Sequence, residues 1–92
     1  MSKRTTTVVH VDYEEKMSLD RAVSFLESIV TKLKEEGSFT LTHDGKTHHI
    51  KPSINVELEV KLEEKSNGKH ELELELEWYE GDDQEKGTIE IG

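Results

Sequence analysis

Hydrophobic residues recur with a helical period between residues 19 and 36. They are separated by steps of three or one, which is the stripe of an amphipathic helix with one buried face: Leu19, Ala22, Val23, Leu26, Ile29, Val30 and Leu33. Ser18 suits the N-cap, Asp20 suits the positive end of the helix dipole, and Gly37 suits a left-handed C-cap. We therefore predict a helix from about Leu19 to Glu36.

Two segments around this helix have the composition of β-strands. Residues Thr5–Lys16 are rich in β-branched and aromatic side chains and contain neither Gly nor Pro, which favours a strand. After the helix, Asp44-Gly45 favours a two-residue type I′ turn. This turn would pair His43 with Lys46, and by parity Leu41 with His48 and Phe39 with Ile50. The match of large side chains across the turn supports a hairpin over residues 39–50.

Strict alternation of apolar and charged residues begins after Pro52, which marks a break or an edge position. A two-residue turn at Asn67-Gly68 would pair Leu62 with Glu73 and bring a charge onto the apolar face. A three-residue loop with Gly68 in the left-handed conformation avoids this mismatch. It produces one face made of aliphatic residues that ends in the only tryptophan: Val56, Leu58, Val60, Leu62, Leu72, Leu74, Leu76 and Trp78.

These elements predict an α+β fold in which one amphipathic helix packs on one face of a mostly antiparallel sheet. The sheet would have four to five strands, in the order β-α-β-β-β-β. The stretch "TIEI" near the C-terminus is either a short last strand or a frayed tail. We expect a single domain over residues 1–92, with residues 1–6 and 81–87 flexible and Trp78 in the core.

Composition narrows the functional classes. The 92-residue chain has a formal net charge of −9, which disfavours nucleic acid and anionic lipid and fits a basic partner, a metal cation or plain solubility better. The absence of cysteine excludes disulfides, thiol catalysis and thiolate zinc sites. No apolar stretch is long enough to span a membrane, and the basic N-terminus precedes no apolar segment of a signal peptide. We expect a cytoplasmic protein without a membrane partner.

The order of elements, together with "ELELELEW" at residues 71–78, resembles the amphi-Trp domain family. The family is named for an amphipathic strand that ends in Trp, here Leu72 to Trp78. The resemblance extends over roughly Tyr13 to Asp83. It implies the order of elements and no catalytic residue, since the family has no established activity. The three histidines near the first hairpin are not an expected family feature.

The predicted register collects carboxylates on the other face of the last hairpin. Three of its four opposed pairs carry like charges, which weakens strand pairing. One interpretation is a solvated face that keeps a small sheet soluble. The other is a docking surface for a basic partner, or a weak divalent-cation site. The candidate partner-binding residues are Glu57, Glu59, Glu63, Glu71, Glu73, Glu75, Glu77 and the adjacent Tyr79.

Histidines of the first hairpin are the other candidate for chemistry. His43 and His48 would share a face and, with Asp44, could bind zinc or nickel weakly. The alternative is that His48 lies at the margin of the core and the other histidines are solvated. His49 points to the opposite face. His10 is isolated in the sequence, and so is His70.

No motif predicts an enzyme. The sequence contains neither a nucleophile elbow nor a phosphate-binding loop, and the glutamate rows are uniformly solvated rather than split into a buried acid and an exposed base. We therefore expect a non-catalytic interaction module without a cofactor. Free strand edges are compatible with either a monomer or a weak homodimer through an edge strand.

Overall fold

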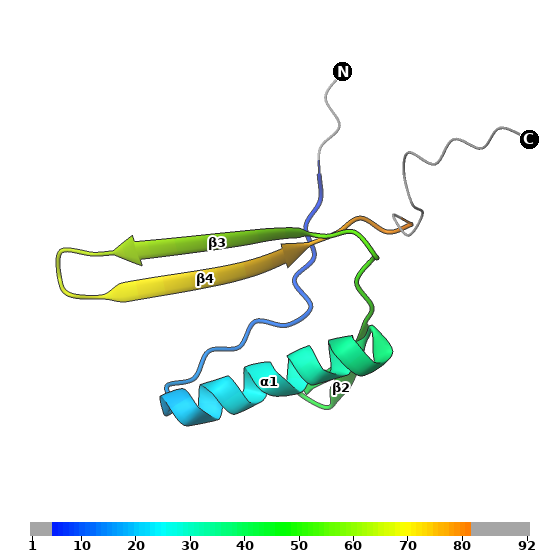
Figure 1. The fold of residues 1–92 in the computed structure, drawn as a ribbon, viewed down its shortest axis with the longest axis horizontal. Coiled ribbons are helices and arrows are strands. Elements are labelled where there is room, and N and C mark those ends of the chain that lie inside the picture. Colours follow the sequence, from blue (N-terminus) through cyan, green and yellow to red (C-terminus); the bar gives the residue numbers. More distant parts are fainter. Residues whose placement is uncertain (1–4, 82–92) are drawn as a thin grey trace, which may run out of the picture. The chain divides into compact units, whose positions relative to one another are not determined.

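The computed structural model describes residues 5–81, which form one helix and two β-hairpins (Figure 1). The chain divides into two compact units, Met1–Ile50 and Lys51–Gly92. The first unit contains the helix and the first hairpin, and the second contains the longer hairpin. The elements are α1 (Leu19–Glu36), β1 (Phe39–His43), β2 (Lys46–Ile50), β3 (Glu57–Glu64) and β4 (His70–Glu77).

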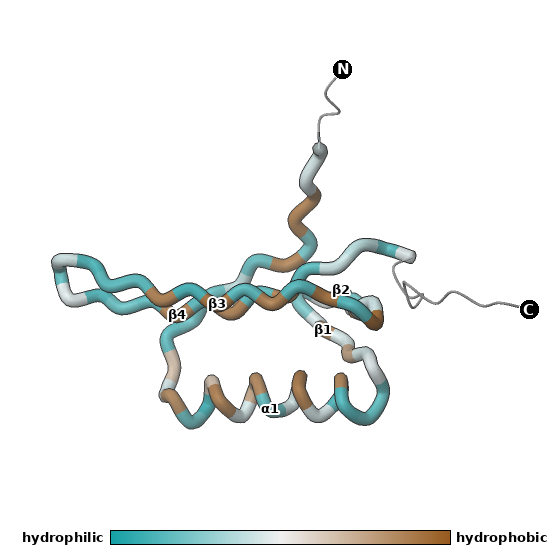
Figure 2. Tube along the Cα trace, turned by 45° about the horizontal axis from the view of Figure 1, so that its top comes forward, coloured by the Kyte–Doolittle hydropathy of each residue, from teal (hydrophilic) through white to brown (hydrophobic). Residues whose placement is uncertain are grey.

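Helix α1 has the predicted bounds and the predicted caps. The hydroxyl of Ser18 accepts a hydrogen bond of 3.2 Å from the backbone N–H of Arg21, which would otherwise lack a partner in the first turn. At the other end, Gly37 is left-handed with φ of 68°, and its N–H donates to the carbonyl of Leu33. Apolar residues recur along one side of the helix (Figure 2). Local sequence therefore determines where α1 begins and ends.

The first hairpin has the predicted turn and register. Asp44 and Gly45 both have positive φ angles, of 50° and 74°, as a type I′ turn requires. Strand β1 pairs antiparallel with β2, so that Phe39 faces Ile50 and Leu41 faces His48. Helix α1 contacts β1 within this unit.

The second hairpin also has the predicted register. Leu62 faces Leu72, and the intervening loop is closed by a 2.8 Å hydrogen bond from the N–H of Lys65 to the carbonyl of Lys69. Gly68 has φ of 88°, which confirms the three-residue loop with a left-handed glycine. Apolar and polar residues alternate along β3 and β4 (Figure 2), so each face of the hairpin has one character.

The fold class is α+β, with four antiparallel strands that belong to two separate two-stranded sheets rather than to one. The predicted strand over Thr5–Lys16 is wrong, because residues 5–18 form no strand. A strand requires a backbone ladder, whereas this segment is attached to the first hairpin by ring contacts of His10 and Tyr13. The strand propensity of Thr5–Lys16 does not determine which strand this segment would pair with.

Among residues 5–81 no residue is buried, so neither unit forms a closed core by itself. In the first unit, an 18-residue helix is about 27 Å long and a five-residue strand about 17 Å, so the short hairpin cannot cover the helical stripe. Ile29, Leu33, Phe39 and Leu41 are half-buried there, while Val30 is exposed.

Among residues 51–81 the second hairpin has no second layer, so nothing described in its own unit covers its apolar row. Leu62 is 74% exposed, and Trp78, predicted to be in the core, is 37% exposed.

Several expectations concern residues outside the described range. The flexible ends at residues 1–6 and 81–87 fall mostly there, and the possible last strand at residues 88–91 falls there completely. Within residues 5–81, the one helix is too polar to cross a membrane.

Candidate functional site

The acidic face of the second hairpin has the pairing expected from its sequence. Glu57 lies opposite Glu77, Glu59 opposite Glu75, and Glu63 opposite Glu71. Alternation along β3 and β4 places these side chains on one face, because successive residues of a strand point to opposite sides. The structure therefore brings all seven predicted glutamates together on one surface.

Lysines divide this surface into two parts. We call the part near the loop the turn half, and it contains three lysines and three glutamates, for a formal charge of zero. Lys61 binds Glu63 at 2.7 Å, and Glu71 accepts from Lys65 at 3.1 Å and lies 3.4 Å from the ammonium of Lys69. The members of the turn half are Lys61, Glu63, Lys65, Lys69, Glu71 and Glu73.

We call the other part the base half, and it consists of four glutamates with a formal charge of −4: Glu57, Glu59, Glu75 and Glu77. In the part of the chain that the structure describes, none of the four forms an ion pair. Carboxylate oxygens of Glu59, Glu75 and Glu77 lie within 4.8 Å of one another, and all three side chains are exposed. The negative charge of the hairpin is therefore concentrated at its base.

The pKa shifts follow the same division. The hydrogen bond with Glu77, followed by the repulsion of its charge, raises the pKa of Glu75 above its ordinary value. In the turn half, hydrogen bonds from Lys65 and Lys69 lower the pKa of Glu71. Ionisation is thus disfavoured at Glu75 in the base half and favoured at Glu71 in the turn half.

The sequence predicted that Glu77 lies opposite Glu57, but it was not used to predict the three-carboxylate cluster of Glu59, Glu75 and Glu77. Parity predicted opposed pairs, and opposed pairs alone bring two carboxylates together. Glu77 lies diagonal to Glu59, a neighbour position within reach of long side chains. The diagonal relation was available from the predicted register and could have identified the triad.

Tyr79 lies beyond the end of β4 and is 83% exposed. Its carbonyl accepts a 2.7 Å hydrogen bond from the hydroxyl of Ser53, which precedes β3. This bond ties the chain after β4 to the chain before β3, at the end of the hairpin that carries the base half. The predicted aromatic residue is thus accessible next to the densest negative charge.

The predicted histidine pair lies on one face of the first hairpin, where both side chains are half-buried. Nε2 of His43 lies 3.3 Å from a carboxylate oxygen of Asp44. Each ring also has an aromatic neighbour from the segment before α1, with Tyr13 beside His43 and His10 beside His48. His10, interpreted as isolated, is therefore in contact with His48. No spacing rule reveals a contact between residues so distant in sequence.

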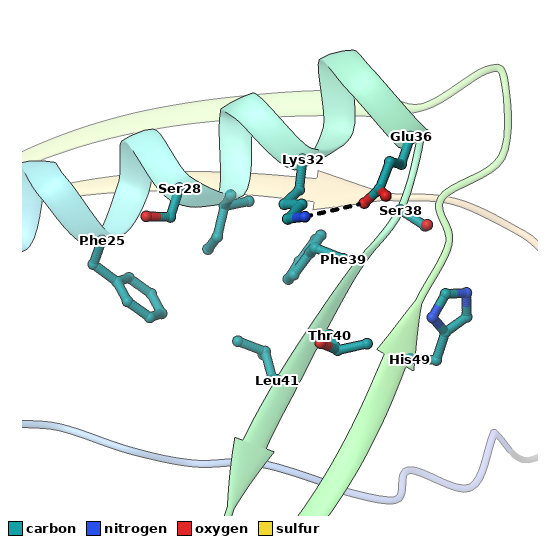
Figure 3. A pocket seen from close by; sticks show the side chains of 10 residues that line it. Phe25, Ser28, Lys32, Glu36, Ser38, Phe39, Thr40, Leu41 and His49 are labelled. Carbon is teal, nitrogen blue, oxygen red and sulfur yellow. Dashed lines mark ion pairs between the residues drawn. The ribbon is translucent and has the colours of Figure 1, made fainter.

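A groove of about 480 Å³ lies between α1 and β1 in the first unit. The side chains of Phe25, Phe39 and Leu41 project toward it (Figure 3). Lys32 and Glu36 form a 3.4 Å ion pair at its rim, and the hydroxyl of Ser28 donates to a backbone carbonyl of its own helix. The groove is an apolar depression with a polar rim. Its lining residues do not form a pair of nucleophile and base.

Comparison with known proteins identifies the family of this chain. A search of the curated proteins and a search of the solved structures each found no match. The family model of the Amphi-Trp domain matches residues 4–92, which is nearly the whole chain. The match confirms the resemblance carried by the strand that ends in Trp78, and the chain belongs to the Amphi-Trp domain family.

Proposed function

We propose that this chain is a non-catalytic binding module that presents its acidic hairpin face to a basic protein segment. The observation that carries the proposal is the uneven distribution of lysines on that face. Three lysines neutralise the turn half, while the base half keeps four exposed glutamates without a cationic partner among the described residues. A face that served solubility alone would not require its like charges to be concentrated at one end.

The base half is also unfavourable for the hairpin itself. Opposed like charges destabilise a strand pair, and threonine would serve the same exposed positions better. A bound Lys or Arg side chain between Glu59 and Glu75 would remove the repulsion that the free hairpin carries. Binding would therefore gain the direct attraction together with the relief of an existing strain, which favours a cationic partner.

The geometry favours an extended partner segment. Successive side chains on one face of a strand are about 7 Å apart, so the two glutamate pairs of the base half are separated by about that distance. Lysines or arginines at alternate positions of an extended peptide have the same spacing. Tyr79 at the end of the patch offers an aromatic face to a guanidinium group.

The proposal includes the packing that the sequence predicts. We propose that the apolar stripe of α1 and the apolar face of β3 and β4 share one core under a single sheet. The support is that both surfaces are apolar along their length and that each keeps exposed apolar side chains: Val23, Leu26 and Val30 on α1, and Leu58, Leu72 and Leu74 on the hairpin. This packing would leave the glutamate face as the outer surface of the sheet.

A labelled peptide of alternating Lys and Thr tests the docking surface. We expect binding to the full chain that weakens steeply with added salt. Replacing Glu59 and Glu75 by Gln should weaken it several-fold. The matched control replaces Glu63 and Glu71 by Gln, which removes the same two charges from one opposed pair of the same face. This control should have a much smaller effect, and equal losses in both variants would reject the base half as the docking site.

Weak binding of a divalent cation is a second candidate function, favoured by the closeness of Glu59, Glu75 and Glu77. Carboxylate oxygens suit Ca²⁺ and Mg²⁺, although such ions usually take six or more oxygen ligands. A thermal melt with Ca²⁺ and with Mg²⁺ tests it, because an ion at 100 times its dissociation constant adds about 2.7 kcal/mol of stability. An unchanged melting temperature at millimolar ion would reject this function.

A further inference from the structure

Two imidazoles from distant parts of the first unit lie close together. His10 precedes α1 and His48 lies in β2, and their ring centroids are 5.8 Å apart with an angle of 53° between the ring planes. The same segment makes a second contact, in which Tyr13 lies against His43 with ring centroids 5.6 Å apart. The two contacts fix the segment against one face of the hairpin. His10 is therefore held beside His48 without any backbone ladder.

This separation suits a shared metal ion. A Zn²⁺–N bond is about 2.0–2.1 Å long, and a ring nitrogen lies about 1.1 Å from the ring centre, so a bound ion sits about 3.2 Å from each centroid. Two rings on one ion then have centroids about 5.2 Å apart at a tetrahedral angle and about 6.4 Å apart when opposite each other. The observed 5.8 Å lies between these limits.

We propose that His10 and His48 form a two-imidazole site for a divalent transition-metal ion of the Zn²⁺ or Ni²⁺ class. Imidazole nitrogen prefers these ions over Mg²⁺ and Ca²⁺, which take oxygen ligands. Within residues 5–81, the only three-residue group with converging ligand atoms is the glutamate triad. The histidine site therefore has two protein ligands, with water in the remaining positions, and it exchanges its ion readily.

The structure assigns the second ligand differently from the sequence pattern. The pattern pairs His48 with His43, but Nε2 of His43 lies 3.3 Å from the Asp44 carboxylate and its ring lies against Tyr13. His10 is the imidazole in contact with His48. A metal ion on this pair would link the segment before α1 to β2. This site uses the first unit alone, so it does not depend on the docking surface proposed above.

Calorimetric titration of the full chain, without a polyhistidine tag, with ZnCl₂ and with NiCl₂ tests the site. We expect one equivalent to bind, and His10→Ala or His48→Gln to weaken binding about tenfold or more, since even supporting residues of metal sites change affinity 10–100-fold. His49→Ala is the matched control, because residue 49 adjoins the site on the opposite face of the same strand. It should change the affinity less than twofold.

Paramagnetic broadening by Ni²⁺ gives a measurement on the unmodified chain. The imidazole signals of His10 and His48 should broaden first, and those of His49 and His70 should remain sharp. Loss of binding in His43→Ala with retention in His10→Ala would overturn the assignment in favour of the other pair. Absence of binding by the unmodified chain, or equal broadening of all five histidines, would overturn the site itself.

Discussion

Glu59 and Glu75 face each other across β3 and β4, and their carboxylate oxygens lie within 4.8 Å. Neither side chain has a cationic partner among the described residues, although lysines neutralise the same face a few residues away. The hairpin thus keeps an electrostatically unfavourable pair at its base. This relationship leads to predictions for stability as well as for binding.

Replacing Glu75 by Gln should stabilise the chain at neutral pH. The pKa of Glu75 is raised, chiefly by its hydrogen bond with Glu77, so the folded chain holds this proton more tightly than the unfolded chain does. Stability is therefore lost as the pH rises through the raised pKa. We expect the variant to melt about 1–3 °C higher at pH 7 and to lose this advantage below the ordinary carboxyl pKa. A variant that melts lower at pH 7 would contradict the repulsion.

Replacing Glu71 by Gln should have the opposite effect and destabilise the chain at neutral pH. Hydrogen bonds from Lys65 and Lys69 lower the pKa of Glu71, so its charged form stabilises the fold above the ordinary carboxyl pKa. This contribution disappears as the pH falls through the lowered value. Melting curves should show the variant less stable than the parent at pH 7, with the two curves converging in acid. Added salt should also narrow the difference, since the ion pairs are partly exposed.

Gly68 should be required for the register of the long hairpin. Its φ of 88° is left-handed, and nothing lies within 4 Å of an added Cβ, so the cost of a side chain is conformational. Gly68→Ala should destabilise the chain by about 1–2 kcal/mol in urea unfolding. Gly68→Asn should cost less, because Asn adopts this conformation more readily. Equal costs for the two variants would argue against the left-handed loop.

Fluorescence of Trp78 can test whether α1 and the long hairpin share a core. If the helical stripe covers the apolar face, Val30→Asp should expose Trp78 and shift its emission to longer wavelength. Thr31→Asp is the control. It introduces the same negative charge at the next residue of the helix, which does not belong to the apolar stripe. Identical spectra for the parent and both variants would contradict the shared core.

The sequence determines the local structure because each element depends on residues close together in the chain. Ser18 and Gly37 set the ends of α1, and Gly45 and Gly68 set the two turns. Once a turn is fixed, parity fixes every cross-strand pair, which is why the registers of both hairpins were predicted correctly. The acidic face follows from the second register without further information.

Long-range contacts were not predictable in the same way. The strand propensity of Thr5–Lys16 does not identify a partner, and the structure attaches this segment through the rings of His10 and Tyr13 instead. The individual ion pairs of the turn half depend on which carboxylates Lys61, Lys65 and Lys69 approach, and flexible lysine side chains carry no periodic signal. Both features bring together side chains that pattern reasoning treats separately.

The most direct test of the docking surface is NMR mapping of the alternating Lys-Thr peptide on the ¹⁵N-labelled full chain. The account predicts that amide shifts are largest for Glu57, Glu59, Glu75, Glu77 and Tyr79, that they saturate, and that they disappear in high salt. The amide shifts of Glu63 and Glu71 should change little, because lysines already neutralise the turn half in which they lie. Shifts of equal size along the whole glutamate face, or shifts centred on the turn half, would contradict it.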